Sequence, residues 1–288
     1  MALPFQVWVQ IIINGLSLGG LYVLIALGLT LILSIMGILQ LAHGEVYMLG
    51  AYAVYYLAVK MGINVYAAIL FSMFLMAGFG MLMERFLFRR CEDKVLSPII
   101  ISTGLTLILQ AGAVIVFGLY ERSIPRLSEG SFELMGVFVP KDRMVAMVIS
   151  ACMAYMLYLF LKRTKLGLGM VASAQNPQAA QLKGIDPHKM SLLAMAIGSG
   201  FAAAGGAMAG SILMLTPFMG TLPLVKGLAI IVLGGMGSLS GAVFGGILIG
   251  LIDGIVPVLF GPLTASLAPL VIVIIILLIR PQGLFGHE

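Results

Sequence analysis

The stretch Lys162–Lys189, KRTKLGLGMVASAQNPQAAQLKGIDPHK, is the longest polar and basic break in the second half of an otherwise mostly apolar chain. Asn176 and Pro177 form a typical helix start, because asparagine can cap the first turn and proline suits the first helical position. Good helix formers follow as far as Lys183, and Gly184 supplies a stop. We therefore predict a helix of about two turns, which is too short to be stable alone and must dock on another surface.

A second helix start follows directly. Asp186 and Pro187 repeat the cap and the proline, and they lead into an apolar segment rich in glycine and alanine, Met190–Leu215. About 20 apolar residues cross a bilayer, so this segment is long enough to span one. The short helix therefore lies in a loop, residues 162–189, between two membrane spans.

The composition is typical of a membrane protein. Hydrophobic residues make up 61% of the chain and charged residues 9%, whereas soluble proteins carry about 25% charged residues. The 36 glycines suit closely packed membrane helices, and the alternating segments of a membrane β-barrel are absent. We predict an all-α fold, a polytopic membrane helix bundle that forms one transmembrane domain over residues 1–288.

The apolar segments predict about eight to nine spans. Val7–Ile38 is either one long tilted helix or an interfacial lead-in followed by one span. Leu224–Met236 is short, so a full crossing and a half-helix that turns at Gly234–Gly237 are both open. The segments are Val7–Ile38, Tyr47–Val59, Val65–Met83, Ile99–Leu119, Val145–Leu161, Met190–Leu215, Leu224–Met236, Leu239–Phe260 and Leu267–Ile279.

The Lys and Arg residues predict the orientation. If loop 162–189 is cytoplasmic, the charged loop 84–98 and the C-terminus lie on the same side, which then holds most of the basic residues. Lys226 is counted on the outer side, and the N-terminus, with no Lys or Arg before Lys60, lies outside. The net charge of +5 reflects orientation and anionic lipid head groups, so no nucleic-acid partner is expected.

The sequence offers no enzymatic site. It has no GxxxxGK[ST] phosphate loop, and no soluble stretch is long enough for a nucleotide-binding domain. The three histidines are scattered and the two cysteines lack metal-site spacing. We expect no catalytic residue, metal or cofactor in this chain; if ATP drives its activity, another subunit binds the nucleotide.

The helix predicted within loop 162–189 is either an ordinary loop helix or a coupling helix whose small alanines let it seat in the groove of a partner. In the second interpretation the coupling residues are Gln175, Asn176, Pro177, Gln178, Ala179, Ala180, Leu182 and Gly184.

Some polar side chains within the spans are candidates for lining a translocation pathway, although such side chains most often join helices by hydrogen bonds. His43 and Glu45 lie at a membrane edge, where they serve either as interfacial residues or as a gate. A proton relay would need more intramembrane acids and bases. Asp253, the one clear acid in a late span, is assigned a structural role. The pathway candidates are Asn14, Ser17, His43, Glu45, Thr103 and Thr106.

Four stretches resemble the permease subunits of branched-chain amino-acid ABC importers, and the length resembles the shorter, H-type permease. The resemblance implies the ABC importer permease fold and transport by alternating access across the bacterial inner membrane. It also implies partners: a longer M-type permease, two ATP-binding subunits that hold ATP and magnesium, and a periplasmic substrate-binding protein. The stretches are Asn14–Tyr22 with Ala26–Leu29, Leu41–Glu45 with Met48–Tyr52, Gly234–Ala242 with Gly245 and Gly246, and Arg280–Gly286.

The predicted coupling helix falls where ABC permeases carry the EAA loop that docks on the ATPase. Gln178 replaces the glutamate of that loop, and no Ile-x-Leu-Pro follows, so the resemblance implies docking without a glutamate salt bridge. The family also includes permeases for urea, short amides and other amino acids. Alternatives from other classes are an ion-coupled secondary transporter and a membrane-embedded lipid transferase, which need clustered intramembrane acids or bases that the sequence scarcely offers.

Overall fold

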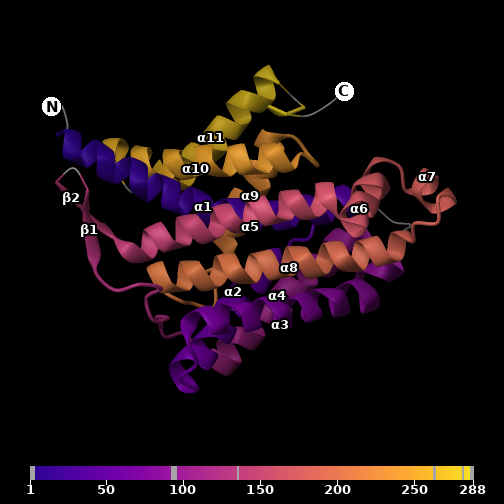
Figure 1. Ribbon diagram of the computed structural model, residues 1–288, viewed down its shortest axis with the longest axis horizontal. Helices are drawn as coiled ribbons and strands as arrows, with labels where there is room; N and C mark the ends of the chain where they lie inside the picture. Colours follow the sequence, from indigo (N-terminus) through magenta and orange to yellow (C-terminus); the bar gives the residue numbers. More distant parts are fainter. Residues whose placement is uncertain (1–3, 92–95, 135, 262–263, 281, 286–288) are drawn as a thin grey trace.

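A computed structural model describes residues 4–91, 96–134, 136–261, 264–280 and 282–285, and its long helices run roughly alongside one another (Figure 1). The last residue of the terminal motif, Gly286, and His287 lie outside this part. The helices are α1 (Phe5–Met36), α2 (His43–Tyr55), η1 (Tyr56–Lys60), α3 (Val65–Phe86), η2 (Phe88–Cys91), α4 (Ser97–Phe117), α5 (Lys141–Arg163), α6 (Lys165–Gln175), α7 (Pro177–Leu182), α8 (Pro187–Ile212), α9 (Thr221–Gly234), α10 (Leu239–Phe260) and α11 (Thr264–Ile279).

Six helices are long and apolar enough to cross a membrane, which confirms a polytopic helical membrane protein. They are α1, α3 with η2, α4, α5, α8 and α10. The predicted count of eight to nine is not confirmed among the described residues. The helix α9 has 14 residues, and α2 has 13 and runs on directly into the 5 residues of η1. At about 1.5 Å per residue, α9 reaches about 20 Å and α2 with η1 about 27 Å, whereas the hydrocarbon core is about 30 Å thick.

The bundle has two distinct ends (Figure 1). The α7 end holds α6, α7 and the close of α3, and the last described residues, 282–285, dock there beside α9. The hairpin end holds the start of α1 and two antiparallel strands, β1 (Ser131–Leu134) and β2 (Val137–Pro140). This hairpin is the one departure from the all-α prediction within the described residues. Loop 162–189, the close of α3 and residues 282–285 all lie at the α7 end, as expected for segments that share one side of the membrane.

The core of the bundle is built on α1 and α8, which bury most of their apolar side chains against α10, α3 and α2. Close packing depends on glycine. A Cβ at Gly206 of α8 would lie 1.9 Å from the carbonyl oxygen of Tyr47 in α2, and one at Gly250 of α10 would lie 2.3 Å from the Cα of Gly19 in α1. The sequence therefore brings backbones together by removing side chains, as membrane helices commonly do.

Two short helices begin in the same place inside the bundle. After α1 ends at Gly37, whose φ is 67°, the chain returns to the interior through buried Gln40 and Ala42. A Cβ at Gly28 of α1 would lie 2.8 Å from Nε2 of His43, so α2 begins beside α1 well before the end of that helix. The first turn of α9 meets it there, because a Cβ at Gly220 would lie 1.9 Å from the carbonyl oxygen of Gly44. This geometry favours the half-helix alternative for Leu224–Met236.

The C-terminal motif closes the free end of α9. The backbone amides of Leu284 and Phe285 donate to the carbonyl oxygens of Leu233 and Gly234 over 2.9 and 3.1 Å. The last carbonyls of a helix have no partner within that helix, and leaving them unsatisfied inside a protein is costly. The terminal residues therefore act as a cap in place of a further helical turn.

Loop 162–189 holds more helix than the sequence predicts. The helix α7 is where it was expected, but α6 also forms ahead of it. The helix α6 contains Gly167 and Gly169, although glycine is a poor helix former. The reason for one of them is tertiary: a Cβ at Gly167 would lie 2.1 Å from the carbonyl oxygen of Phe160, so α6 folds back tightly on the end of α5.

Candidate coupling helix and translocation pathway

The helix α7 has the caps that the sequence predicts. The side-chain oxygen of Asn176 accepts from the backbone amide of Ala179 over 2.9 Å, and Pro177 occupies the first turn. At the other end, Gly184 adopts a φ of 83° and its amide donates to Gln181, while the amide of Ile185 donates to Ala180. The backbone of this six-residue helix is therefore fixed by its own ends.

Most of the predicted coupling residues face away from the bundle. Leu182 is 90% exposed, and an apolar side chain so exposed at a helix tip is available to a partner. Ala180 is the exception, because it is only 4% exposed and turns toward the protein itself. Its small side chain therefore positions α7 on the bundle. The other exposed coupling residues are Gln175, Asn176, Pro177, Gln178, Ala179 and Gly184.

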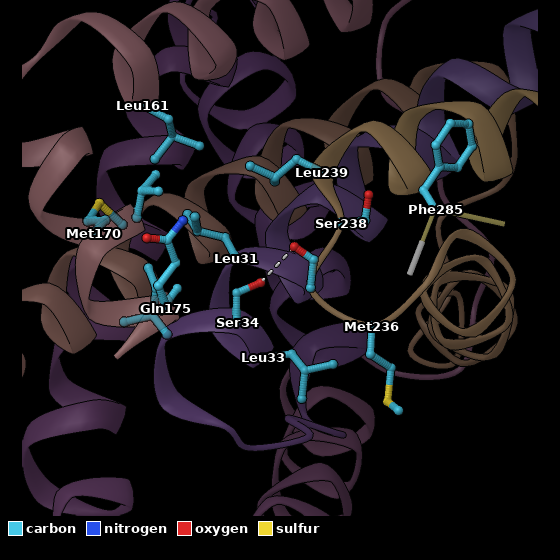
Figure 2. Close-up of a pocket in the computed structure, with 14 residues that line it drawn as sticks. Leu31, Leu33, Ser34, Leu161, Met170, Gln175, Met236, Ser238, Leu239 and Phe285 are labelled. Atoms are coloured by element: carbon cyan, nitrogen blue, oxygen red, sulfur yellow. Dashed lines mark hydrogen bonds between the residues drawn. The ribbon is translucent and has the colours of Figure 1, made fainter. Parts of the chain in front are cut away.

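A cavity of about 710 Å³ lies behind α6 at the α7 end (Figure 2). Its walls are the end of α1, the inner face of α6 and the turn that joins α9 to α10. Ser34 donates from its hydroxyl to the carbonyl oxygen of Gly237 over 3.3 Å and ties two of these walls together. The cavity therefore separates part of α6 from the end of α1. The lining includes Leu31, Leu33, Ser34, Leu161, Met170, Gln175, Met236, Ser238, Leu239 and Phe285.

Two pathway candidates, Asn14 and Ser17, lie on α1 near the hairpin end. The side-chain oxygen of Asn14 accepts a hydrogen bond from the guanidinium of Arg143, which joins α1 to α5. Ser17, one turn further along α1, is buried. These contacts agree with the alternative that polar residues in membrane helices join neighbouring helices.

The other candidates lie at the start of α2 and on α4. His43 is fully buried and its Nδ1 lies 3.3 Å from the side-chain oxygen of Gln40. Glu45 accepts a hydrogen bond over 2.8 Å from the side-chain amide of Gln110 in α4. Thr103 and Thr106 lie on α4 and donate to carbonyl oxygens of their own helix. The structure therefore brings Glu45 to α4 through Gln110, a residue that the candidate set lacked although it continues the helical spacing of the two threonines.

Three largely buried polar residues, whose contact the sequence did not predict, join three helices. Lys226 of α9 forms an ion pair with Asp253 of α10, and the hydroxyl of Tyr22 in α1 donates to the same carboxylate over 2.7 Å. Lys226, which the Lys and Arg count places on the outer side, lies within α9 with only 14% of its side chain exposed. The predicted structural role of Asp253 agrees with this arrangement, since intramembrane charges occur mostly in pairs.

Comparison with known proteins assigns the family. Residues 11–279 match the family described as branched-chain amino acid transport system, permease component. The chain belongs to this family. The permease is 31% identical to the high-affinity branched-chain amino acid transport system permease protein BraD of Pseudomonas aeruginosa, over 97% of this chain and 96% of that protein. It is 27% identical to the corresponding LivH protein of Escherichia coli, over 100% of this chain and 98% of its relative.

A solved structure supports the fold of the permease. PsaBC from Streptococcus pneumoniae, in complex with a Fab, aligns with a TM-score of 0.53 over 93% of this chain and 91% of the matched chain, at 13% identity. The likeness is one of fold alone. The family match identifies the chain as the permease component of a transport system and not an enzyme.

In this permease α4 is the least covered of the long helices. Among the described residues, the spanning window of α4 is 11% buried, against 78% for that of α8. Nothing lies within 4 Å of a Cβ built at Gly104 or Gly112, and Ile115 is 83% exposed. The face of α4 that is turned from α2 is therefore open in the single chain.

Proposed function

We propose that this chain is the transmembrane permease subunit of an ATP-driven importer that carries branched-chain, hydrophobic amino acids across the bacterial inner membrane by alternating access. The observation that carries the proposal is that the chain, matched to the permease family over residues 11–279, presents a capped, exposed helix, α7, at one end of its bundle. The curated relatives, which are branched-chain amino acid permeases by name, support the substrate class. The same family carrying urea, short amides or other amino acids is the second candidate.

The proposed assembly has four further subunits. Two ATP-binding subunits lie at the α7 end and hold the ATP and magnesium, so this chain carries no cofactor of its own. An M-type permease forms a heterodimer with it, and a periplasmic binding protein delivers the substrate at the hairpin end. The open face of α4 supports a partner within the membrane, because Gly104 and Gly112 on this face would let a second helix approach closely.

The proposed cycle passes through α7. All of residues 1–288 act as one transmembrane domain, and loop 162–189 is its coupling loop. Closure of the ATP-binding subunits moves α7, and α6 transmits the displacement to the end of α1 across the cavity of Figure 2. The bundle then rocks against its partner between inward and outward openings. In this topology α2 and α9 count as half-helices that begin inside the bundle.

The variant Leu182→Glu tests the docking assignment. A carboxylate at this exposed apolar tip is expected to remove co-purification of the ATP-binding subunits and to lower leucine uptake about tenfold or more, since buried interface anchors cost about 2 kcal/mol or more when lost. Leu119→Glu is the matched control, because Leu119 is also exposed but lies beyond the end of α4 toward the hairpin end. Retention of the ATP-binding subunits by Leu182→Glu would refute the assignment.

The substrate class and the energy source are tested by uptake in cells that lack or carry the chain. We expect chain-dependent uptake of radiolabelled leucine, isoleucine and valine that stops on ATP depletion while the proton gradient is maintained. Chain-dependent uptake of urea or acetamide without leucine uptake would select the second candidate. Uptake that survives ATP depletion would identify an ion-coupled secondary transporter.

A further inference from the structure

A polar cluster lies where α2, α4 and α9 meet, and its centre is the carboxylate of Glu45. The side-chain nitrogen of Gln110 donates to one oxygen of Glu45 over 2.8 Å and lies 3.5 Å from the hydroxyl of Thr221. Glu45 is only 1% exposed. Three helices thus contribute one polar side chain each to one cluster, with Glu45 on its buried side and Thr221 at its exposed edge.

The second oxygen of Glu45 is unused. It is buried and accepts no hydrogen bond within the described part of the chain. No lysine, arginine or histidine nitrogen among the described residues lies within 4 Å of this carboxylate, whereas Asp253 has Lys226. A carboxylate that is buried without a cationic partner is costly, and a primary ammonium would supply both the charge and the missing donor.

The surroundings suit the other half of an amino acid. The helix α9 begins at Thr221, and no side chain caps its first turn. The start of a helix carries partial positive charge, and discontinuous helices in transporters commonly aim this end at an anionic group of the substrate. A cationic and an anionic substrate group would therefore meet Glu45 and the start of α9 respectively, side by side.

One edge of the cluster reaches the surface of the single chain at Thr221. Thr103, Thr106 and Gln110 share one face of α4, and both Thr103 and Thr221 are exposed in the single chain. The alternative is a purely structural role, in which Glu45 stabilises the first turn of α2, because acidic side chains are stabilising at the start of a helix. That role explains the charge, but it does not explain a glutamine brought from α4 or a carboxylate oxygen left without a donor.

We propose that Glu45, held by Gln110, receives the ammonium group of the amino-acid substrate as it passes between α4 and the start of α9. The first turn of α9 at Thr221 faces the substrate carboxylate. The inference rests on the proposed function and adds to it a named site for the zwitterionic head group, the part that all branched-chain amino acids share.

The first test measures charge at the site without measuring transport. Thr221→Cys is placed in a Cys91→Ser, Cys152→Ser background, and the purified complete assembly is treated with cationic and anionic methanethiosulfonate reagents of similar size. Adding Glu45→Gln is expected to lower the preference of the introduced thiol for the cationic reagent about tenfold, the effect of removing one nearby charge. An unchanged preference, or no reaction of this thiol with either reagent, would overturn the proposal, because the site would then carry no charge on a water-accessible path.

The second test measures leucine uptake. Glu45→Gln is expected to lower the maximal rate about tenfold or more, the loss expected when a hydrogen bond to a charged group is removed. KM should not change, because the binding protein sets it, and Glu45→Asp should restore part of the rate. Ser72→Ala is the control, because it removes a buried hydroxyl that donates to the Gly50 carbonyl oxygen of α2 without touching the site.

The outcomes separate the inference from the proposed function. If the unaltered chain supports no leucine uptake, the proposed function fails. If it supports uptake, and Glu45→Gln matches it with equal amounts in the membrane, the inference alone fails. A loss of rate that is equalled by Ser72→Ala, or that follows the amount of folded protein, assigns Glu45 a structural role and also overturns the inference.

Discussion

At the level of single residues, the ion pair between Lys226 and Asp253 predicts a large loss of protein stability when one partner is removed. Lys226→Met leaves the carboxylate buried and unpaired, which typically costs about 3–5 kcal/mol. Adding Asp253→Asn removes that charge and keeps an acceptor for Tyr22, so the double variant should recover most of the loss. The measurement is the apparent Tm of the detergent-solubilised protein. Additive losses from the two changes would show that the pair is not coupled.

Among the helices, glycine decides how closely two backbones approach, and α8 offers a matched comparison. Gly206→Ala would place a methyl group against the backbone of Tyr47, and we expect it to destabilise the packing of α2 on α8 by about 1–3 kcal/mol. Gly200→Ala meets nothing nearer than 3.5 Å and should be neutral or slightly stabilising, because alanine is the better helix former. Thermal unfolding of both variants checks this, and an equal effect at the two positions would contradict it.

For the molecule as a whole, the two ends of the bundle must face opposite sides of the membrane. The α7 end carries Arg85, Arg89 and Arg90 besides the lysines of loop 162–189, so it is expected to be cytoplasmic. In a Cys91→Ser, Cys152→Ser background, Tyr120→Cys should react with an impermeant maleimide in spheroplasts. Arg89→Cys should react only after permeabilisation. The reverse pattern would invert the proposed topology and remove α7 from the reach of an ATP-binding subunit.

Features that depend on neighbouring residues could be predicted from the sequence. Apolar runs placed six long membrane helices, and Asn176, Pro177 and Gly184 placed α7 with both caps, because capping and partition into the bilayer act over a turn or a span of chain. The family resemblance came from short motifs of the same kind.

In contrast, the packing of the bundle determines which residues distant in the sequence come into contact. It put Ala180 on the inner side of α7, paired Lys226 with Asp253, and brought Gln110 to Glu45. It also set α2 and α9 start to start inside the bundle, a geometry that an apolar run of that length does not specify. These contacts join helices that are far apart in the chain. Leaving a polar side chain or a backbone carbonyl unpaired in the low-dielectric interior is costly, so the packing that pairs these groups is favoured.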